Sequence, residues 1–577
     1  MSRMDDAPDD TETSASRDIV ARVQRLADGA EQRWKLLAIA QREIGLDPDA
    51  PVSPTAARGP RERALELLHH TRSFLLPRAR DLDAPLLIAI IGPTGSGKSS
   101  LLNTLAGSPV SRTGVLRPTT RDAVAVGGAG DLQRALDDGA LAGLAPDHVE
   151  RHEVEVMPGL VIVDAPDVDS VEHADRALAD HLLEAADLAI FVTTATRYAD
   201  RVPWDVLARA QQRQLGLIVI VNRMPAGEDA EVVLADLTAM LAETELRVRE
   251  ILPVPEGALG ANGASLASSS VEPLRRWLAT LSADAAERHA LAAEALAGAL
   301  RGTTPLVRAV ADDLAQEVRL RRTLLQHARD IHADETAVML DRLFSGSFLR
   351  EEVIRHWHSF VGADQVTRYF AKGIGQLRGA VASLLRRTPR APVVAVQQGA
   401  TDDITALVTN HAAEAARRTA ERWSAEPEGA LIIAAHPELW TCSPELEEAT
   451  RAAVDAWIAS LAQDVAQRGA ERRGPARVAA LGVNAAAVTL MLVTFAHTGG
   501  LTGAEAGIAA ATAFLNQKLL NALFGEATVQ EMIGRARRSL TEAIEALMAD
   551  ERRRFEARLG DVDAREQLAH ELRSIAV

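Results

Sequence analysis

The stretch GPTGSGKS, residues 92–99, decides the fold of this chain. It fits the pattern G-x-x-x-x-G-K-[ST], with Gly92, Gly97, Lys98 and Ser99 at the fixed positions. An apolar run, PLLIAII, precedes it, and a helical pattern, SSLLNTLAG, follows it. Glycines let successive backbone N–H groups turn onto phosphate oxygens, and the helix N-terminus adds its positive dipole end. A chance glycine-rich turn would not need these flanks, so the stretch predicts a phosphate-binding P-loop.

Each residue of this loop is a candidate contact for a nucleotide. Lys98 is expected to reach the β- and γ-phosphates, which makes it a catalytic candidate, and the Ser99 hydroxyl is expected to ligate Mg²⁺. The candidate nucleotide contacts from the loop are Gly92, Pro93, Thr94, Gly95, Ser96, Gly97, Lys98, Ser99 and Ser100.

Two further signals follow the loop in the order that a triphosphate site needs. Asp164 ends the apolar run GLVIVD, and a carboxylate at such a strand end holds Mg²⁺ through water. The segment RPTTRDAV (117–124) lies between, and a threonine there can bind Mg²⁺ and sense the γ-phosphate. Thr119 and Thr120 are both candidate metal ligands, and Thr120 is also a catalytic candidate. Many strands end in Asp for turn reasons alone, but the position after a P-loop favours the metal role.

Short apolar runs alternate with helical patterns from Pro85 to about Leu281. Continuous apolar runs of this length suit strands that are buried on both faces of a parallel sheet. The alternation predicts an α/β domain over residues 85–281, doubly wound around a mostly parallel sheet. The runs are PLLIAII (85–91), GLVIVD (159–164), LAIFVTT (188–194), GLIVIVN (216–222) and the weaker EILPVP (250–255).

The rest of the chain is predicted to be helical or disordered. Residues 1–16 are acidic and lack an apolar core, which predicts a disordered tail and not a signal peptide. Residues 17–84 are expected to hold N-terminal helices, with a proline-rich linker that ends at Pro60. Residues 284–577 show no strand pattern and predict a long all-α domain, with helices at 284–345, 402–422, 445–470 and 529–575 and basic loops at 386–392 and 468–477.

Charge and cysteine content restrict the class of protein. The formal net charge is −17, from 63 Lys and Arg against 80 Asp and Glu, which argues against nucleic acid as a partner. The single cysteine, Cys442, excludes a disulfide framework and fits a reducing cytosol. We therefore expect a cytoplasmic protein, with any contact to anionic lipid made through a local basic patch.

The motifs GPTGSGKS, RPTTR, DAPD (164–167) and NRMP (222–225), in this order, resemble those of the translation-factor-related GTPases. Within that group they resemble the dynamin-like and Era-like branch. The resemblance covers residues 85–281 and implies a P-loop, a first switch, a D-x-x-G second switch and an N/T-K-x-D base-recognition motif. It implies GTP as the substrate, Mg²⁺ as the cofactor and GTP hydrolysis as the activity. Asn222 and Arg223 would stand for Asn and Lys of the last motif, where Asn222 could contact the base.

Two of the motifs depart from the family pattern. Asp167 replaces the glycine of the second switch, and Val168 stands where some GTPases have a glutamine or histidine that orients the attacking water. Gly95 is neither the serine of dynamins nor the asparagine of potassium-assisted relatives, so no water-positioning group is assigned. Pro225 replaces the aspartate that binds guanine, and losing that acceptor should reduce discrimination against adenine. GTP is therefore the preferred substrate, and ATP remains a competitor.

Residues 478–525 hold a weakly charged pattern with two interpretations. No charged residue occurs from Val478 to Ala504, and Thr-Gly-Gly at 498–500 could form the turn of a helical hairpin. A membrane-inserting hairpin, as in dynamin-like proteins, and a buried pair of Ala-rich helices fit equally well. Asn484 and His497 would be costly in lipid, so insertion at the inner face of the membrane is favoured over a stable span.

Three functions fit these observations. The first is a dynamin-like GTPase that self-associates through its G-domain and helices at or near membrane lipid. The second is a soluble nucleotide switch whose helical domain docks onto a protein partner. The third is a P-loop ATPase outside the GTPase group, which the position of RPTTR disfavours.

Overall fold

The computed structural model describes residues 10–43, 47, 59–112, 123–136, 141, 149–154, 157–166, 173–257, 260, 265–345, 390–471 and 525–576. Contacts within the chain divide it into two compact units. Unit 1 comprises Met1–Arg42, Leu46–Gln316 and Asp563–Val577, and unit 2 comprises Glu43–Gly45 and Glu317–Val562. The long helix α10 (Ala285–Ser345) contributes residues to both units.

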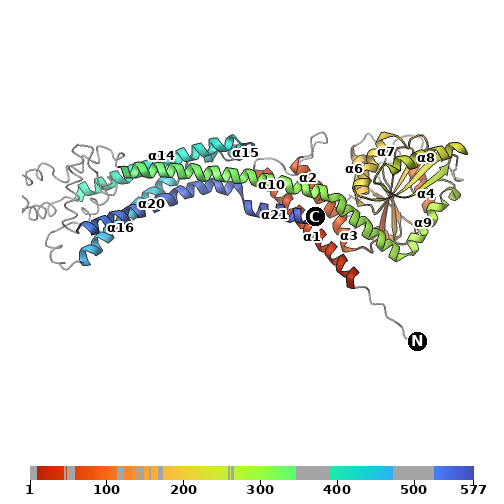
Figure 1. Ribbon diagram of the computed structural model, residues 1–577, viewed down its shortest axis with the longest axis horizontal. Coiled ribbons are helices and arrows are strands. Elements are labelled where there is room, and N and C mark those ends of the chain that lie inside the picture. Colours follow the sequence, from red (N-terminus) through yellow and green to blue (C-terminus); the bar gives the residue numbers. More distant parts are fainter. Residues whose placement is uncertain are drawn as a thin grey trace, which may run out of the picture. The chain divides into compact units, whose positions relative to one another are not determined.

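Unit 1 contains a seven-stranded sheet in the described part of the chain, with helices on both of its faces (Figure 1). The strand order is β3-β2-β4-β1-β5-β6-β7, and every pairing is parallel except that of β2 with β4. The strands are β1 (Leu86–Ile91), β2 (Ala123–Gly127), β3 (Val149–Glu153), β4 (Leu160–Asp164), β5 (Leu188–Thr194), β6 (Gly216–Met224) and β7 (Arg247–Pro255). The prediction of a doubly wound, mostly parallel sheet is confirmed.

Two strands, β2 and β3, lie where the sequence pattern predicted none. β3 has the sequence VERHE and buries Val149 alone, because it is an edge strand whose other side chains face solvent or are half-buried. β2 is fully buried but consists of Ala, Val and Gly, and its five residues are too few and too small to form a clear apolar run. Edge position and small side chains therefore hid both strands.

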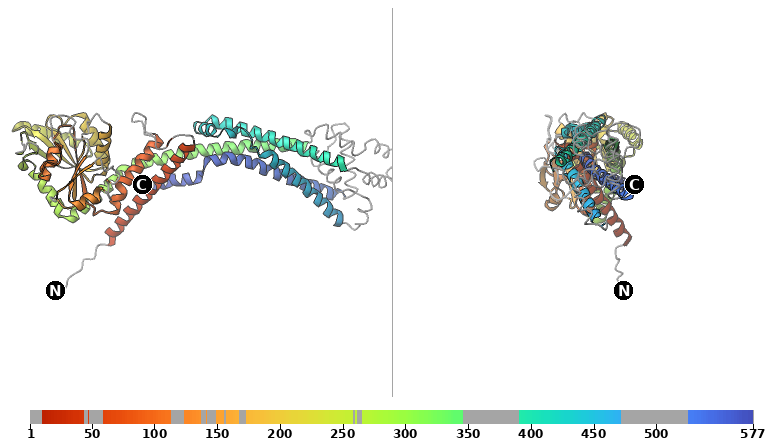
Figure 2. Two further views of the ribbon diagram at one scale, coloured as in Figure 1. Left: turned by 180° about the vertical axis from the view of Figure 1, so that it is seen from behind. Right: turned by 90° about the vertical axis from the view of Figure 1, so that its left-hand side faces the viewer.

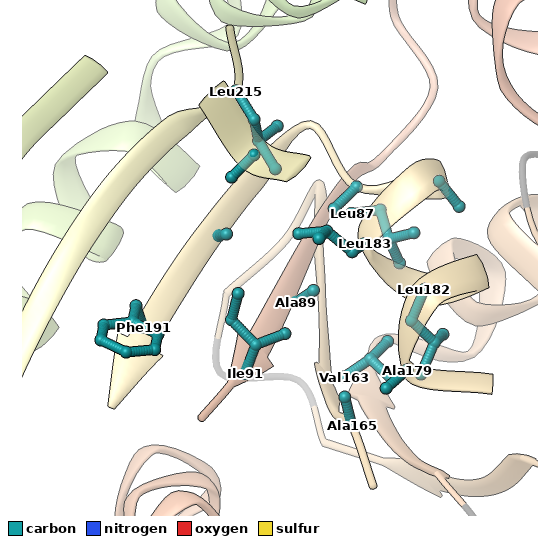
Figure 3. Packing of buried hydrophobic residues seen from close by; sticks show 14 of the residues in the cluster. Leu87, Ala89, Ile91, Val163, Ala165, Ala179, Leu182, Leu183, Phe191 and Leu215 are labelled. Carbon is teal, nitrogen blue, oxygen red and sulfur yellow. The ribbon is translucent and has the colours of Figure 1, made fainter. Parts of the chain in front are cut away.

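Helices cover both faces of the sheet because the side chains of each central strand alternate between two cores. Leu87, Ala89 and Ile91 of β1 point into the first core, against Leu182 and Leu183 of α6 (Figure 3). Leu86, Ile88 and Ile90 point into the second core, on the other face. The first core includes residues of α5 (Ala129–Leu136), α6 (His173–Ala185), α7 (Arg201–Gln212) and α8 (Glu228–Ala242), and the second includes residues of α4 (Lys98–Ala106) and α9 (Glu272–Ala283).

Helices from both ends of the chain complete unit 1. Leu26, Phe74, Leu314 and Leu572 are buried in one shared core, although they come from four distant segments. These segments are α1 (Asp10–Glu43), the continuous α2 (Pro60–His70), π-helical η1 (Thr71–Leu75) and α3 (Leu76–Arg80), the first part of α10, and α21 (Val562–Ile575). α1 begins at Asp10, so it extends into the stretch that we expected to be a disordered tail up to residue 16.

A buried ion pair attaches α3 to the sheet. The guanidinium of Arg78 donates to the carboxylate of Asp187, immediately before β5, and neither side chain is more than 4% exposed. Asp187 also accepts the backbone N–H of Leu87 at 2.8 Å, and Arg78 donates to the carbonyl oxygen of Ala84 at 3.0 Å. Burial raises the pKa of the Asp187 carboxyl, and the Arg78 charge opposes that rise.

Unit 2 consists of helices alone in its described residues. α14 (Arg390–Ser424), α16 (Leu446–Glu471) and α20 (Glu526–Glu556) run along the second half of α10 (Figures 1 and 2). They share a core that includes Met339, Ile404, Trp457 and Leu540. Shorter elements are α15 (Pro427–Ala435), η5 (Pro437–Trp440) and η6 (Ala557–Leu559).

Three helix boundaries in this region differ from the predictions. α14 begins at Arg390, inside the predicted basic loop 386–392, because Pro392 is tolerated in the first turn of a helix. The predicted loop at 468–477 overlaps the end of α16 at Glu471. The predicted helix at 529–575 is broken after η6, where Gly560 has a φ of 61°. Residues 478–524 of the predicted hairpin lie outside the described residues. Among the helices that the structure describes, none is long and apolar enough to span a membrane.

Candidate nucleotide site

The P-loop joins the end of β1 to the start of α4, as the motif predicts. Gly92 and Gly97 have φ values of 154° and 104°, a region that favours glycine. A Cβ atom at Gly92 would lie 2.1 Å from the carbonyl oxygen of Val192, and one at Gly97 would lie 2.4 Å from Nδ2 of Asn222. A side chain at position 92 would clash with the backbone, and one at position 97 would displace the Asn222 amide and strain the backbone, so the loop conformation favours glycine at both positions.

Lys98 is held along the P-loop. Its side chain is buried, and Nζ donates to the carbonyl oxygens of Gly92 at 3.0 Å and Pro93 at 3.4 Å. The P-loop backbone therefore holds the ammonium group against the carbonyl oxygens of Gly92 and Pro93. A buried cation in this position attracts an anion strongly because little water screens it.

Ser99 and Asp164 meet at the carboxyl end of the sheet. The Ser99 hydroxyl donates to Oδ2 of Asp164 at 2.6 Å, and the same oxygen accepts the Ser111 hydroxyl at 3.0 Å. Asp164 is fully buried at the end of β4. Asn103 holds Ser111 through two hydrogen bonds, donating to its carbonyl oxygen at 2.9 Å and accepting its N–H at 2.8 Å. Two hydroxyl groups and one carboxylate thus gather at the first turn of α4.

Asn222 and Arg223 support the P-loop from β6. Nδ2 of Asn222 donates to the carbonyl oxygen of Ser96 at 2.9 Å, and its Oδ1 accepts the N–H of Arg223 at 2.8 Å. Nη2 of Arg223 donates to the carbonyl oxygen of Gly95 at 3.3 Å, from a backbone with φ of 54°. The structure therefore gives Asn222 a loop-holding contact where the sequence suggested a contact to the base.

The second half of the predicted site lies outside the described residues. This applies to Thr119 and Thr120 of the first switch and to Asp167 and Val168 of the second. Pro225 is described and is half-buried at the end of β6. Thr94 and Ser100, the other polar residues of the P-loop region, both accept hydrogen bonds through their carbonyl oxygens, from Arg197 at 2.9 Å and from the Thr104 hydroxyl at 2.6 Å.

Two residues at this site were not found from the sequence. Ser111 lies after α4 and Arg197 lies after β5, and neither belongs to a motif with fixed spacing. Arg197 is far from the P-loop along the chain, and the fold alone brings residues 94 and 197 together. The sequence offered one signal for Arg197, which is that it follows a strand whose carboxyl end lies beside that of β1.

Strand, P-loop, helix and strand-end aspartate in this arrangement define a P-loop nucleoside-triphosphate-binding domain. Residues 87–223 match the family model described as 50S ribosome-binding GTPase. The match lies within the α/β domain of this chain, which therefore has the sequence pattern of a GTPase domain.

Two relatives match about a third of the chain. A probable transmembrane GTPase, FZO-like and chloroplastic, from Arabidopsis thaliana is 24% identical over 201 residues, which is 34% of this chain and 22% of the relative. GTPase Der from a Synechococcus strain is 27% identical over 191 residues, which is 33% of this chain and 37% of the relative. The similarity therefore spans well under half the length of each relative.

Solved structures also resemble the chain. A bacterial dynamin of an oligomerised pair, described as sensing and tethering membranes, is 12% identical, with 93% of this chain and 94% of that chain covered and a TM-score of 0.41. Aquifex aeolicus Era bound to GDP and AlF4⁻ is 19% identical, with 33% of this chain and 55% of that chain covered and a TM-score of 0.24.

Proposed function

We propose that this chain is a Mg²⁺-dependent GTPase of the dynamin-like type that acts at or near membrane lipid. The observation that carries the proposal is the Ser99–Asp164 pair beside a P-loop whose lysine is buried against the loop carbonyls. This arrangement places a cation, two oxygen-bearing side chains and a helix N-terminus at one loop, which suits a triphosphate with its metal ion.

The oxygen atoms at the site fit Mg²⁺. Mg²⁺ prefers oxygen ligands and is usually bound by one or two carboxylates together with substrate phosphates. Ser99 supplies the hydroxyl, Asp164 supplies a carboxylate that would hold the ion through water, and Thr119 or Thr120 is proposed as the switch threonine. When bound, the ion would neutralise charge on the phosphate oxygens. The hydrogen bond from the Ser111 hydroxyl would keep the Asp164 carboxylate in place for this role.

The proposed reaction is hydrolysis of the γ-phosphoryl group. The oxygen of a water molecule forms a bond to the γ-phosphorus, and the bond from that phosphorus to the β–γ bridging oxygen breaks. The bonding electrons stay on the bridging oxygen of GDP, and the water proton leaves to the phosphate product or to solvent. Lys98 and the P-loop N–H groups would stabilise the charge on the β- and γ-oxygens.

GTP is proposed as the substrate, with ATP as the alternative. The family match and the FZO-like and Der relatives are GTPases by name, which favours GTP. Pro225 offers no carboxylate to the guanine N1–H and amino group, so the advantage of GTP over ATP should be smaller here. The two nucleotides differ at these base atoms, so a competition measurement separates them.

The dynamin-like part of the proposal rests on layout. N-terminal helices, a GTPase domain and a long helical unit follow one another along the chain, and the FZO-like relative is a transmembrane GTPase by name. We propose self-association through the GTPase domain and helices, and peripheral insertion of residues 478–525 at the inner face of the membrane. The alternative is a soluble switch whose helical unit docks onto a protein partner.

The first experiment is a titration of the full chain with fluorescent GTP and ATP analogues, with and without Mg²⁺, beside Lys98→Ala. Preference for GTP that Lys98→Ala abolishes supports the proposal. Equal binding of the two nucleotides, or tighter binding of ATP, would contradict GTP as the preferred substrate and leave a P-loop nucleoside triphosphatase. Normal binding by Lys98→Ala would refute the site.

The second experiment measures turnover across protein concentrations and with liposomes of anionic lipid. The dynamin-like proposal requires specific activity to rise with one or both. Specific activity that stays flat across both series supports the soluble switch.

A further inference from the structure

Arg197 lies against the P-loop although it belongs to the segment that follows β5. Its backbone N–H donates to the carbonyl oxygen of Thr194 at 3.0 Å, in a turn between β5 and α7. From this turn, Nη1 donates to the carbonyl oxygen of Thr94 at 2.9 Å, and Nε donates to Oδ2 of Asp200 at 2.8 Å. Two directional contacts therefore orient the guanidinium plane, and its side chain is 35% exposed.

Thr94 is the P-loop residue directly after Gly92 and Pro93, whose carbonyl oxygens accept hydrogen bonds from Lys98. The lysine of a P-loop reaches the β- and γ-phosphates, and here its Nζ bonds to the carbonyl oxygens of Gly92 and Pro93. Arg197 bonds to the next carbonyl oxygen along the loop. Lys98 and Arg197 thus bring two positive charges to consecutive peptide groups of the loop, and the Lys98 side chain is buried whereas that of Arg197 is 35% exposed.

We propose that Arg197 is a catalytic arginine that this chain supplies to its own nucleotide site. It would stabilise the negative charge on the γ-phosphate oxygens as the bond to the β–γ bridging oxygen breaks. An arginine in this role is supplied either within the chain or by a partner protein, and its loss reduces hydrolysis by large factors. The inference rests on the proposed GTPase function, and it names a charge-stabilising group that the motifs themselves do not provide.

Asp200 prepares Arg197 for this role. An orienting carboxylate holds the guanidinium before substrate arrives, so little reorganisation is needed when charge develops. Arginine suits the position better than lysine because its planar fork can bond to a carbonyl oxygen and approach a phosphate at the same time. The competing explanation is structural, in which Arg197 and Asp200 only fasten the P-loop to the end of β5.

Arg197→Ala separates these explanations when it is compared with Arg201→Ala. Arg201 is an exposed arginine at the start of α7, four positions along the same segment, so it controls for loss of one charge. We expect Arg197→Ala to lower kcat for GTP by about 100-fold or more, with a change of no more than about threefold in the Kd for GTP. A structural fastener would instead weaken binding of GTP and GDP.

A second readout does not depend on turnover. Fluorescent GDP with AlF4⁻ mimics the transferring phosphoryl group, so a charge-stabilising arginine is needed to form that complex but not to bind GDP. We expect the wild type and Arg201→Ala to form the complex and Arg197→Ala to fail. Millimolar guanidinium ion should restore part of the Arg197→Ala activity, whereas Arg197→Lys should restore less than wild-type activity.

A mixing experiment tests whether the arginine serves its own site. Neither Lys98→Ala nor Arg197→Ala should hydrolyse GTP well, and a mixture should stay inactive if Arg197 acts within its own chain. Activity restored by mixing would overturn that assignment, and an Arg197→Ala chain with wild-type kcat would overturn the catalytic role. A wild-type chain that hydrolyses no nucleotide would instead refute the proposed function.

Discussion

The hydroxyl of Ser99 lies 2.6 Å from Oδ2 of Asp164, which joins the first turn of α4 to the end of β4. The two residues are 65 positions apart in the chain. Their meeting depends on the parallel pairing of β1 with β4, which brings the ends of both strands to one edge. Because Asp164 is fully buried, its carboxylate is positioned by these contacts and not by solvent.

Asp164→Asn should weaken the effect of Mg²⁺ on nucleotide binding. Asparagine keeps the shape of the side chain but removes the charge, and loss of an outer-shell partner of a metal typically costs 10- to 100-fold in metal affinity, so we expect a loss of about that size. The measurement is the Kd for fluorescent GTP over a Mg²⁺ series. Ser111→Ala, which removes the second hydroxyl on Asp164, should give a smaller loss in the same direction. An unchanged Mg²⁺ dependence in Asp164→Asn would contradict the metal site.

Asn222→Ala should weaken GTP and ATP binding by similar factors. The Asn222 amide bonds to the Ser96 carbonyl oxygen and to the Arg223 N–H, so its loss loosens the P-loop and leaves both backbone groups without that partner. Removing a buried hydrogen-bond partner costs about 1–3 kcal/mol, which is on the order of 10- to 100-fold in affinity. Competition between the two nucleotides is the measurement. A loss confined to GTP would show that Asn222 contacts the base after all.

Arg78→Met should destabilise the chain more than a typical ion-pair variant. Removing one partner of a buried pair costs about 3–5 kcal/mol because Asp187 is left charged and buried. Adding Asp187→Asn should recover part of this loss, since the amide stays neutral and its oxygen can still accept the Leu87 N–H. Urea unfolding followed by circular dichroism measures the effect. Arg72→Met breaks an exposed pair with Glu31 and should cost less than about 1 kcal/mol.

Acid should destabilise unit 2 through His332. This histidine is 2% exposed, its ring packs edge-on against Phe555 with centroids 5.7 Å apart, and neither ring nitrogen has a hydrogen-bond partner among the described residues. Burial lowers its pKa to about 4, and the nearby carboxylate of Glu551 opposes part of that shift. The neutral ring is therefore favoured in the folded state, and this contribution is complete above about pH 6.5 and declines as pH falls towards 4.

The His332 effect amounts to about 2 kcal/mol between pH 7 and pH 5. His332→Leu, which cannot titrate, should lose less stability over that interval than the wild type. Urea unfolding at both pH values is the measurement, and equal losses in the two chains would exclude His332 as a source of acid sensitivity. His70 in unit 1, whose pKa burial lowers to about 3, should add to the wild-type acid sensitivity in the same direction.

Local patterns were sufficient to predict most of the sheet and the P-loop. The strands β1, β4, β5 and β6 are continuous apolar runs because both of their faces are buried, and such runs stand out in any sequence. The P-loop is equally visible because the backbone at positions 92 and 97 favours glycine. The strands β2 and β3 escaped notice because short or exposed strands leave no such pattern.

The sequence by itself determined the residues that require a fixed spacing: the P-loop, the strand-end Asp164 and the helical composition of unit 2. The tertiary structure alone decided which distant side chains meet them. Ser111 reaches Asp164, Asn222 reaches the carbonyl oxygen of Ser96, and Arg197 reaches that of Thr94. The physical reason is that a motif records a constraint on neighbouring backbone groups, whereas these contacts depend on the order in which strands pair. That order places the ends of β1, β4, β5 and β6 at one edge of the sheet and leaves no periodic trace in the chain.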